Sequence, residues 1–148
     1  MADIRHRFGT SASPAAVYAA VGTLDGLNDW WTTDTRGDPS PGGTLAFHFG
    51  RDEPSAVMEV LESVPDERVV WRCVDGPDTW VGTTFTFDIS ADDDQTVLMF
   101  TNEGWKEAVP FLHHCSTKWA YFLLGLKTRL QGGPSIAFPN DAKLDAWG

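Results

Sequence analysis

A chain of 148 residues is the size of one domain, and such a domain buries roughly two-thirds of its unfolded surface without a metal or disulfides. Its formal net charge of −10 excludes the basic surface that nucleic-acid binding requires, and it disfavours anionic membranes. No apolar run approaches the ~20 residues of a membrane span, and the opening MADIRHRF lacks the apolar core of a signal peptide. With two cysteines, too few for a secreted disulfide framework, we expect one cytoplasmic domain over residues 1–148.

The N-terminal part of the chain predicts a strand followed by two short helices. Ile4, His6 and Phe8 alternate with charged residues, which is typical of a strand with one buried face. Ser13 precedes a proline and suits a helix N-cap, so a short helix follows it. A second short helical segment is predicted from Leu24 to about Trp31. Two small helices in succession indicate an insert rather than a crossover between parallel strands.

Five consecutive strands are predicted in the middle of the chain. The polar segment from Thr32 to Gly43, rich in Gly and Pro, predicts a loop. Beyond it, alternating apolar residues separated by turn residues predict strands at Thr44–Phe49, Ser55–Val64, Arg68–Val74, Trp80–Ile89 and Gln95–Glu103. Consecutive strands joined by short turns form an antiparallel meander, which makes six strands together with the N-terminal one.

The most regular element is a helix predicted over Pro110–Leu130. Its apolar residues recur at steps of three and four and fall on one stripe, namely Leu112, Cys115, Trp119, Phe122, Leu123, Leu126 and Leu130. A proline suits the first helical position, and two glycines and a further proline end the helix. The tail over residues 131–148 has no clear period, although Phe138 and Trp147 are apolar enough to pack back onto the domain.

The order of the predicted elements separates the helices from the run of strands, which indicates an α+β fold rather than an alternating α/β fold. A twisted, six-stranded antiparallel sheet has to bury one face, and the long C-terminal helix is the element that can cover it. If the sheet curls around this helix, a space remains between the two.

Several short motifs accompany this order of elements over nearly the whole chain. They are Trp30-Trp31, Glu59-Val60, Val69-Val70-Trp71, Trp80-Val81-Gly82-Thr83, Asn102-Glu103-Gly104, Cys115-Ser116 and Trp119. With them the chain resembles the START/SRPBCC superfamily, which has the helix-grip fold. Within that superfamily it is similar to the small bacterial homologues of the activator of the heat-shock-protein-ninety ATPase.

This resemblance implies a cavity between the sheet and the C-terminal helix that takes a small apolar or aromatic molecule. Relatives in the superfamily include lipid carriers, plant ligand-binding proteins, polyketide aromatase/cyclases and subunits of ring-hydroxylating oxygenases. The fold alone therefore does not choose an activity.

Large rings are abundant, with seven Trp and nine Phe against two Tyr. Such rings either line a ligand cavity or pack one dry core. We expect a cavity lined by Trp30, Trp71, Trp80, Phe85, Phe87, Phe100, Leu112, Cys115, Trp119, Phe122, Leu123 and Leu126. A dry core made by the same side chains is the alternative.

Few polar residues suggest catalysis. Glu59 alternates with apolar neighbours, so it either faces inward as an acid or base or pairs with Arg72 at the surface. His113 and His114 diverge by ~100° on a helix and cannot bind one metal ion together. We expect both in solvent or at the cavity rim, where a hydrogen bond to a ligand is the alternative. Cys115 is expected to be a buried hydrophobe rather than a nucleophile, and we predict neither metal nor cofactor.

These observations lead to three hypotheses about function. The first is a non-enzymatic carrier or sensor that binds a lipid-like or polyketide-like molecule in the cavity. The second is a small cyclase/dehydratase or hydrolase that uses Glu59 or a rim histidine in the same cavity. The third is a chaperone cofactor or a homodimer that presents an apolar patch to its partner. Nucleic-acid binding and membrane insertion are not expected.

Overall fold

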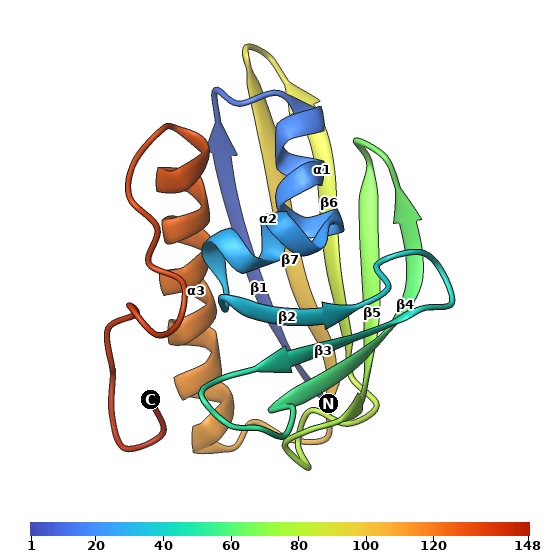
Figure 1. Ribbon diagram of the computed structural model, residues 1–148, viewed down its shortest axis with the longest axis vertical. Coiled ribbons are helices and arrows are strands. Elements are labelled where there is room, and N and C mark those ends of the chain that lie inside the picture. The colour runs from blue at the N-terminus through green and yellow to red at the C-terminus, as the bar shows by residue number, and fades with distance from the viewer.

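The computed structural model describes all residues, 1–148, and consists of one antiparallel sheet with three helices (Figure 1). In chain order the elements are β1 (Ala2–Thr10), α1 (Pro14–Gly22), α2 (Leu24–Trp30), β2 (Asp34–Gly37), β3 (Thr44–His48), β4 (Ala56–Val64), β5 (Arg68–Asp75), β6 (Thr84–Asp92), β7 (Gln95–Trp105) and α3 (Pro110–Leu130). This order confirms the predicted α+β arrangement, in which two short helices follow the first strand and a long helix ends the domain.

The sheet has the strand order β1-β7-β6-β5-β4-β3-β2, and every neighbouring pair is antiparallel. Strands β2 to β7 form the meander, and β1 joins its far edge by pairing with β7, where Phe8 lies opposite Leu98. Alternation along β6 directs Phe85, Phe87 and Ile89 to the buried face. The sheet curves around α3, as the helix-grip fold requires.

The prediction of six strands was short by one. The seventh strand, β2, lies within the segment that the sequence predicts as a loop, and it pairs with β3 at the edge of the sheet. Only Thr35 of this strand is buried, and its backbone N–H donates a hydrogen bond to Asn28 Oδ1 at 2.8 Å. Because β2 exposes almost all of its side chains, it lacks the apolar alternation by which a strand is recognised.

The start of β6 was also predicted too early. The segment from Trp80 to Thr83 forms a tight turn in which the backbone N–H of Thr83 donates to the Trp80 carbonyl at 2.9 Å. Gly82 adopts a φ of +88°, a conformation that favours glycine. The alternation of Val81, Thr83 and Phe85 in the sequence therefore continues across a turn, and the strand itself begins at Thr84.

The two short helices pack closely at one end of the sheet. The Ser13 side chain caps α1 by accepting a hydrogen bond from Ala16 N, and Thr23 caps α2 by accepting from Gly26 N. A Cβ on Gly26 would lie only 2.0 Å from the Ala19 carbonyl oxygen, so only glycine allows the two helices to approach this closely. Their position places Trp30 and the following Trp31 against the core.

Helix α3 has the predicted bounds and buries the predicted stripe against the sheet, except for Leu130 at its end, which is half-buried. Trp119 is at the centre of this contact, with its ring centroid 4.4 Å from that of Phe100, 4.8 Å from Trp31 and 5.8 Å from Phe85. At the flank of the stripe, His6 Nε2 hydrogen-bonds the Ser116 carbonyl at 3.0 Å and ties β1 to the helix. None of the helices is long and apolar enough to cross a membrane.

The tail after α3 runs back along the outside of this helix (Figure 1). Its first part is attached to the domain by backbone hydrogen bonds from Thr33 N to the Phe138 carbonyl and from Phe138 N to the Trp31 carbonyl. The ring of Phe138 packs on Phe49 with a centroid distance of 5.3 Å. Trp147 packs on Phe111 at 5.4 Å, so both apolar tail residues singled out in the sequence contact the domain.

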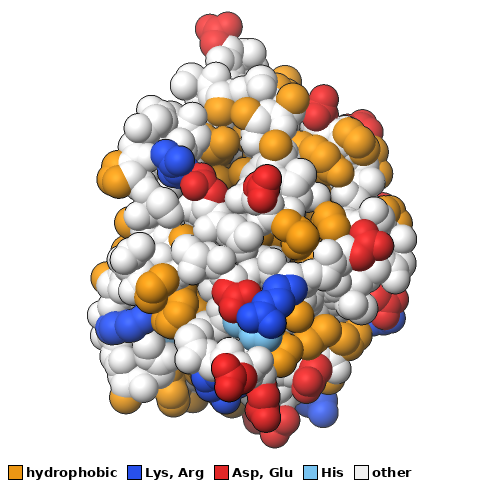
Figure 2. Space-filling model, in the orientation of Figure 1, with side chains coloured by type: hydrophobic (Ala, Val, Ile, Leu, Met, Phe, Trp, Pro, Cys, Tyr) orange, Lys and Arg blue, Asp and Glu red, His pale blue; other side chains and the backbone are white.

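Charged side chains are distributed over the surface rather than gathered in one place. On the face shown in Figure 2, acidic side chains are scattered among apolar and neutral polar ones, and basic side chains do not form a patch. Half-exposed ion pairs join neighbouring elements, for example Arg68 with Asp88 across β5 and β6 and Arg129 with Asp29 between α3 and α2. Exposed pairs of this kind each contribute only ~0–1 kcal/mol to stability.

A buried hydrogen-bond network holds the turn from Trp80 to Thr83 against β7. Asn102 is fully buried, and its Nδ2 donates to Thr83 Oγ1 at 3.0 Å and to the Thr84 carbonyl at 3.1 Å. Its Oδ1 accepts from Trp105 Nε1 at 2.7 Å, while Thr83 Oγ1 donates to the Trp80 carbonyl at 2.7 Å. One amide side chain therefore fixes the position of the turn that carries Trp80.

We expect Asn102→Ala to lower the free energy of unfolding by ~2–4 kcal/mol, because it removes three hydrogen bonds and leaves the Trp105 N–H buried without an acceptor. Urea denaturation followed by tryptophan fluorescence measures this change. The exposed Asn140 provides the control, and Asn140→Ala should change stability by no more than ~0.5 kcal/mol. Equal effects of the two substitutions would contradict the proposed role of the network.

Candidate ligand-binding site

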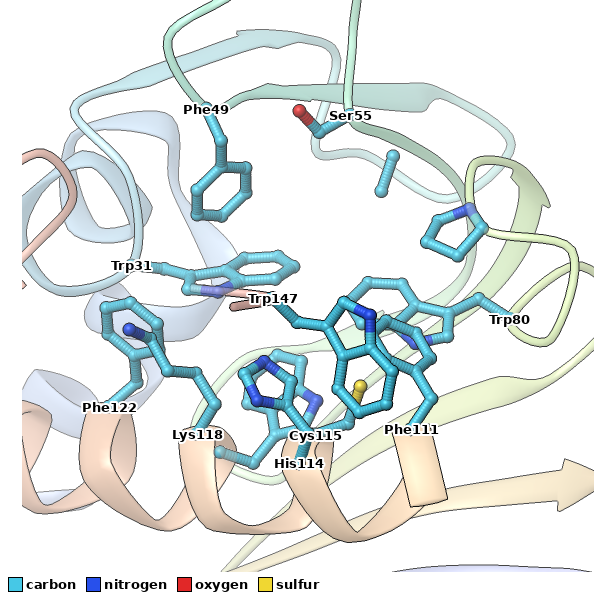
Figure 3. A pocket seen from close by; sticks show the side chains of 13 residues that line it. Trp31, Phe49, Ser55, Trp80, Phe111, His114, Cys115, Lys118, Phe122 and Trp147 are labelled. Carbon is cyan, nitrogen blue, oxygen red and sulfur yellow. The ribbon is translucent and has the colours of Figure 1, made fainter. Parts of the chain in front are cut away.

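A cavity of about 200 Å³ opens to solvent beside the N-terminal half of α3 (Figure 3). The other walls come from the end of α2, the β3–β4 connection, the β5–β6 connection and the C-terminal tail. The lining residues are Trp31, Phe49, Ser55, Ala56, Pro77, Trp80, Phe111, His114, Cys115, Lys118, Trp119, Phe122 and Trp147. Nine of these thirteen residues are hydrophobic, so the cavity has mostly apolar walls.

The helical wall of the cavity follows from the repeat of α3. Phe111, Cys115, Trp119 and Phe122 recur at steps of three and four and therefore share one face of the helix. Cys115, Trp119 and Phe122 are buried, whereas Phe111 is only half-buried because it lies near the first turn. This face is the edge of the stripe that packs on the sheet, so core and cavity share residues.

The wall opposite the helix is built from stacked rings. Trp31 lies 4.4 Å from Phe47 and 5.5 Å from Phe49 between ring centroids, and 6.1 Å from Trp71 in a nearly parallel stack. These contacts hold Trp31 between the core and the cavity. In Figure 3, Phe49 lies across the space from α3, with Trp31 on one side and Trp80 on the other.

The tail closes one side of the cavity through Trp147. His114 stacks on Phe111 with their planes 9° apart, and Trp147 packs edge-on against both rings. His114 Nδ1 lies 2.9 Å from the Asp145 carboxylate, two residues before Trp147. A hydrogen bond from the Trp147 backbone N–H, with smaller contributions from His114 and Lys118, holds the pKa of Asp145 below its ordinary value.

Lys118 attaches the tail to the middle of α3. Its ammonium group lies 2.7 Å from the Asp141 carboxylate and 2.8 Å from the Gly148 carbonyl. Burial alone would raise the pKa of Asp141, but the hydrogen bonds from Lys118 and Lys143 outweigh it, so this pKa lies below its ordinary value. The Asp141 side chain is only 3% exposed, which makes this ion pair the most buried one of the tail. The charge of Lys118 is thus committed to the tail.

Both cysteines are buried free thiols. Burial raises the pKa of Cys115 to about 12, against a smaller lowering by the indole N–H of Trp80, and burial raises the pKa of Cys73 to about 11. A thiol with such a pKa stays protonated at neutral pH and is a poor nucleophile. This supports the interpretation of Cys115 as an apolar wall residue.

Of the twelve residues predicted to line the cavity, the structure brings four to it, namely Trp80, Cys115, Trp119 and Phe122. The other eight are Trp30, Trp71, Phe85, Phe87, Phe100, Leu112, Leu123 and Leu126, and all of them are buried in the core cluster. The two alternatives derived from the sequence therefore both occur. Most of the space between sheet and helix is dry core, and an open cavity remains at one end.

Glu59 is not among the cavity residues. It lies on β4 opposite Arg72 of β5, and the two side chains form a half-exposed ion pair at 3.3 Å. The salt bridge is thus the arrangement seen, rather than the inward-facing carboxylate. His113 is exposed, whereas His114 lies at the cavity. The structure holds no group of three or more His, Cys, Asp or Glu side chains around one point, so no residues are assigned to a metal.

Sequence reasoning missed several wall residues for two different reasons. Phe111 lies four positions before Cys115 and Lys118 lies four positions before Phe122, so the helical period could have found them. Trp31 was left out of the expected lining in favour of Trp30, because the sequence does not show which ring of the Trp30-Trp31 motif faces the cavity. In the structure both rings are buried. Trp147 carries no periodic signal, since its position depends on the path of the tail.

The raised pKa values predict a loss of stability at alkaline pH. The folded state keeps the Cys115 thiol protonated while the unfolded chain ionises near pH 9, so this contribution is complete below pH 9 and is lost as the pH rises towards 12. Between pH 8 and pH 10 we expect the free energy of unfolding to fall by ~1.4 kcal/mol more in the wild type than in Cys115→Ala. Urea denaturation at both pH values measures the difference, and identical pH dependence would contradict it.

Comparison with known proteins places the chain in a family. The model of the family described as Activator of Hsp90 ATPase homolog 1-like protein matches residues 11–131. Among solved structures, the solution structure of the Aha1 dimer from Colwellia psychrerythraea is 39% identical, with a TM-score of 0.82, over 90% of this chain and 98% of that one. A search of curated proteins found no match.

Two further structures share the fold at lower identity. The crystal structure of CalU16 from Micromonospora echinospora is 22% identical with a TM-score of 0.74, and covers 90% of this chain and 76% of that chain. DynU16, from the dynemicin biosynthetic locus, is 18% identical with a TM-score of 0.70, over 89% of this chain and 48% of that chain. The motifs from Trp30-Trp31 to Trp119, the helix-grip architecture and the matched model agree. The chain belongs to the family of Activator of Hsp90 ATPase homolog 1-like proteins.

Proposed function

We propose that this protein binds a small apolar or aromatic molecule in the cavity beside the N-terminal half of α3, as a carrier or sensor of that molecule. The observation that carries the proposal is the wall itself, in which nine of thirteen residues are hydrophobic and the rings of Trp31, Phe49 and Trp80 surround an open space. Concave sites with aromatic walls and a few polar groups are typical of small-molecule binding.

The size of the cavity suggests the size of the ligand. An apolar cavity of ~150 Å³ can hold benzene, so about 200 Å³ with an open side suits one or two fused rings with a short substituent. The bicyclic hydrocarbon 2-ethylnaphthalene is therefore a suitable probe. Larger lipid-like or polyketide-like molecules would have to extend through the open side or displace Trp147.

The structural relatives support a small-molecule ligand at the level of the fold. DynU16, which belongs to a biosynthetic locus, has the same architecture. At 18% identity this likeness concerns the fold alone, and it does not choose the ligand. Within this chain the support comes from the cavity walls.

An enzyme of the cyclase/dehydratase or hydrolase type is the alternative for the same cavity, and His114 is the residue that would serve it. Its Nδ1 is held by Asp145, an arrangement that orients an imidazole for proton transfer. However, its ring is also packed between Phe111 and Trp147, and we assign it to holding the tail. Chemical change of a bound molecule, abolished by His114→Asn, would favour the enzyme instead.

Interaction with other proteins is the second alternative. The family description names the Hsp90 ATPase. If this protein forms a stable complex with Hsp90 and binds no apolar probe, a role as chaperone cofactor would be favoured.

We also propose that two copies of this chain associate, because the protein from Colwellia psychrerythraea, 39% identical, is described as a dimer. Sedimentation velocity should then give twice the mass of one chain, and a single-chain mass at all concentrations would contradict the dimer.

Binding of 2-ethylnaphthalene in the cavity is tested by truncating one wall ring. Phe111→Ala removes an aromatic wall residue that is only half-buried, so we expect ~10-fold weaker binding with the fold retained. Leu124→Ala is the matched control, since Leu124 lies on the same helix, is 61% exposed and does not line the cavity. Equilibrium dialysis measures both variants, and equal affinities would exclude this cavity as the binding site.

A further inference from the structure

The indole nitrogen of Trp80 is the one buried side-chain nitrogen or oxygen of the chain that has no hydrogen-bond partner. A buried donor without an acceptor is unfavourable, and such a group in a folded protein usually has a reason. Trp80 forms a wall of the cavity (Figure 3), and the neighbouring Cys115 offers its N–H only a sulfur atom, which is a weak acceptor. The unpaired donor therefore belongs to the candidate site.

Two tryptophans away from the cavity show the contrast. Trp30 Nε1 donates to the Ala20 carbonyl at 2.8 Å, and Trp105 Nε1 donates to Asn102 Oδ1 at 2.7 Å, so both rings are fixed through their nitrogens. Trp80 is partly exposed and is held by its contact with Phe85 and by the backbone of its turn. Because no bond fixes its nitrogen, a small rotation of the ring can present the N–H to a molecule in the cavity.

The charged groups at the cavity are already neutralised by the tail. The Lys118 ammonium lies at hydrogen-bond distance from the Asp141 carboxylate and the carbonyls of Ala142 and Gly148, which uses its three donors. His114 is bonded to Asp145. An anionic ligand would find no free cation at the cavity. Besides the Ser55 hydroxyl and His114 Nε2, which no protein group bonds, the cavity thus offers one buried unpaired donor, in mostly apolar surroundings.

We propose that the cavity selects uncharged aromatic molecules with one hydrogen-bond acceptor, such as an aryl ketone or quinone carbonyl, which accepts from Trp80 Nε1. This inference rests on the proposed function and narrows its ligand class. The acceptor restores a hydrogen bond that the protein does not provide, while the ring system fills the apolar space. An acceptor-free hydrocarbon gains only the second contribution, and a carboxylate loses solvation without gaining a cation.

A double-mutant cycle between protein and probe tests the contact. The probes are 2-acetylnaphthalene, its acceptor-free analogue 2-ethylnaphthalene and the anion 2-naphthoate, and the variant is Trp80→Phe, which removes the N–H. We expect the affinity ratio of ketone to hydrocarbon to fall ~10-fold in Trp80→Phe, as for the loss of one hydrogen bond in a dry site. The same affinity ratio should change less than ~2-fold in Trp119→Phe, because this substitution weakens the binding of both probes to the same extent.

An independent readout is the ¹H,¹⁵N signal of the Trp80 indole in the wild-type protein, assigned by its absence in Trp80→Phe. It should shift downfield with 2-acetylnaphthalene and much less with 2-ethylnaphthalene, and this measurement holds even if the variant is unstable. An unchanged ratio in Trp80→Phe, an equal loss in Trp119→Phe or 2-naphthoate binding as tightly as the ketone would overturn the inference while leaving hydrocarbon binding intact. Failure of all three probes to bind the wild type would overturn the proposed function as well.

Discussion

The burial of one stripe of α3 against the curved sheet is the interaction on which the rest of the structure depends. Trp119 contacts rings from both the sheet and the α2 end, with Phe100 and Trp31 at 4.4 and 4.8 Å. Truncating such a residue typically costs ~3–5 kcal/mol, a large share of the ~5–15 kcal/mol by which a domain is stable. The β1 strand, the two short helices and the meander all contribute side chains to this contact, so the sheet has to curve around the helix.

The cavity is a consequence of the same packing. Towards the middle and C-terminal end of α3, the space beneath the helix is filled by core rings such as Phe87 and Phe100 and by Leu126. Near the N-terminal end of α3, the helix faces the loops that follow β3 and β5 instead of strands. These loops leave an open space beside Cys115. The candidate site therefore lies at the margin of the core. Its inner walls are rigid because they are core residues, and its outer wall is the tail.

The polar contacts of the tail give this wall its position. Lys118, His114 and Tyr121 of α3 each bond a different tail residue, namely Asp141, Asp145 and Ala142. These bonds bring Trp147 over the cavity and at the same time neutralise the charges nearest to it. Structure and selectivity are linked here, because the interactions that attach the tail also remove the cation that an acidic ligand would need. The N–H of Trp80 remains as the one buried donor at the cavity without a partner.

By itself the sequence determined the elements whose side chains repeat with a period. The bounds of α3 and its stripe, the capped helix after Ser13 and the buried residues of β6 followed from spacing, because a helix or strand with one buried face has to repeat its apolar residues. Only the tertiary structure decided the features without a period: the edge strand β2, whose side chains are exposed, and the turn at Gly82. It also decided which rings fill the core and which line the cavity. Trp30 and Trp31 are both buried, and their neighbours in space, together with the path of the tail to Trp147, assign one to the core and the other to the site.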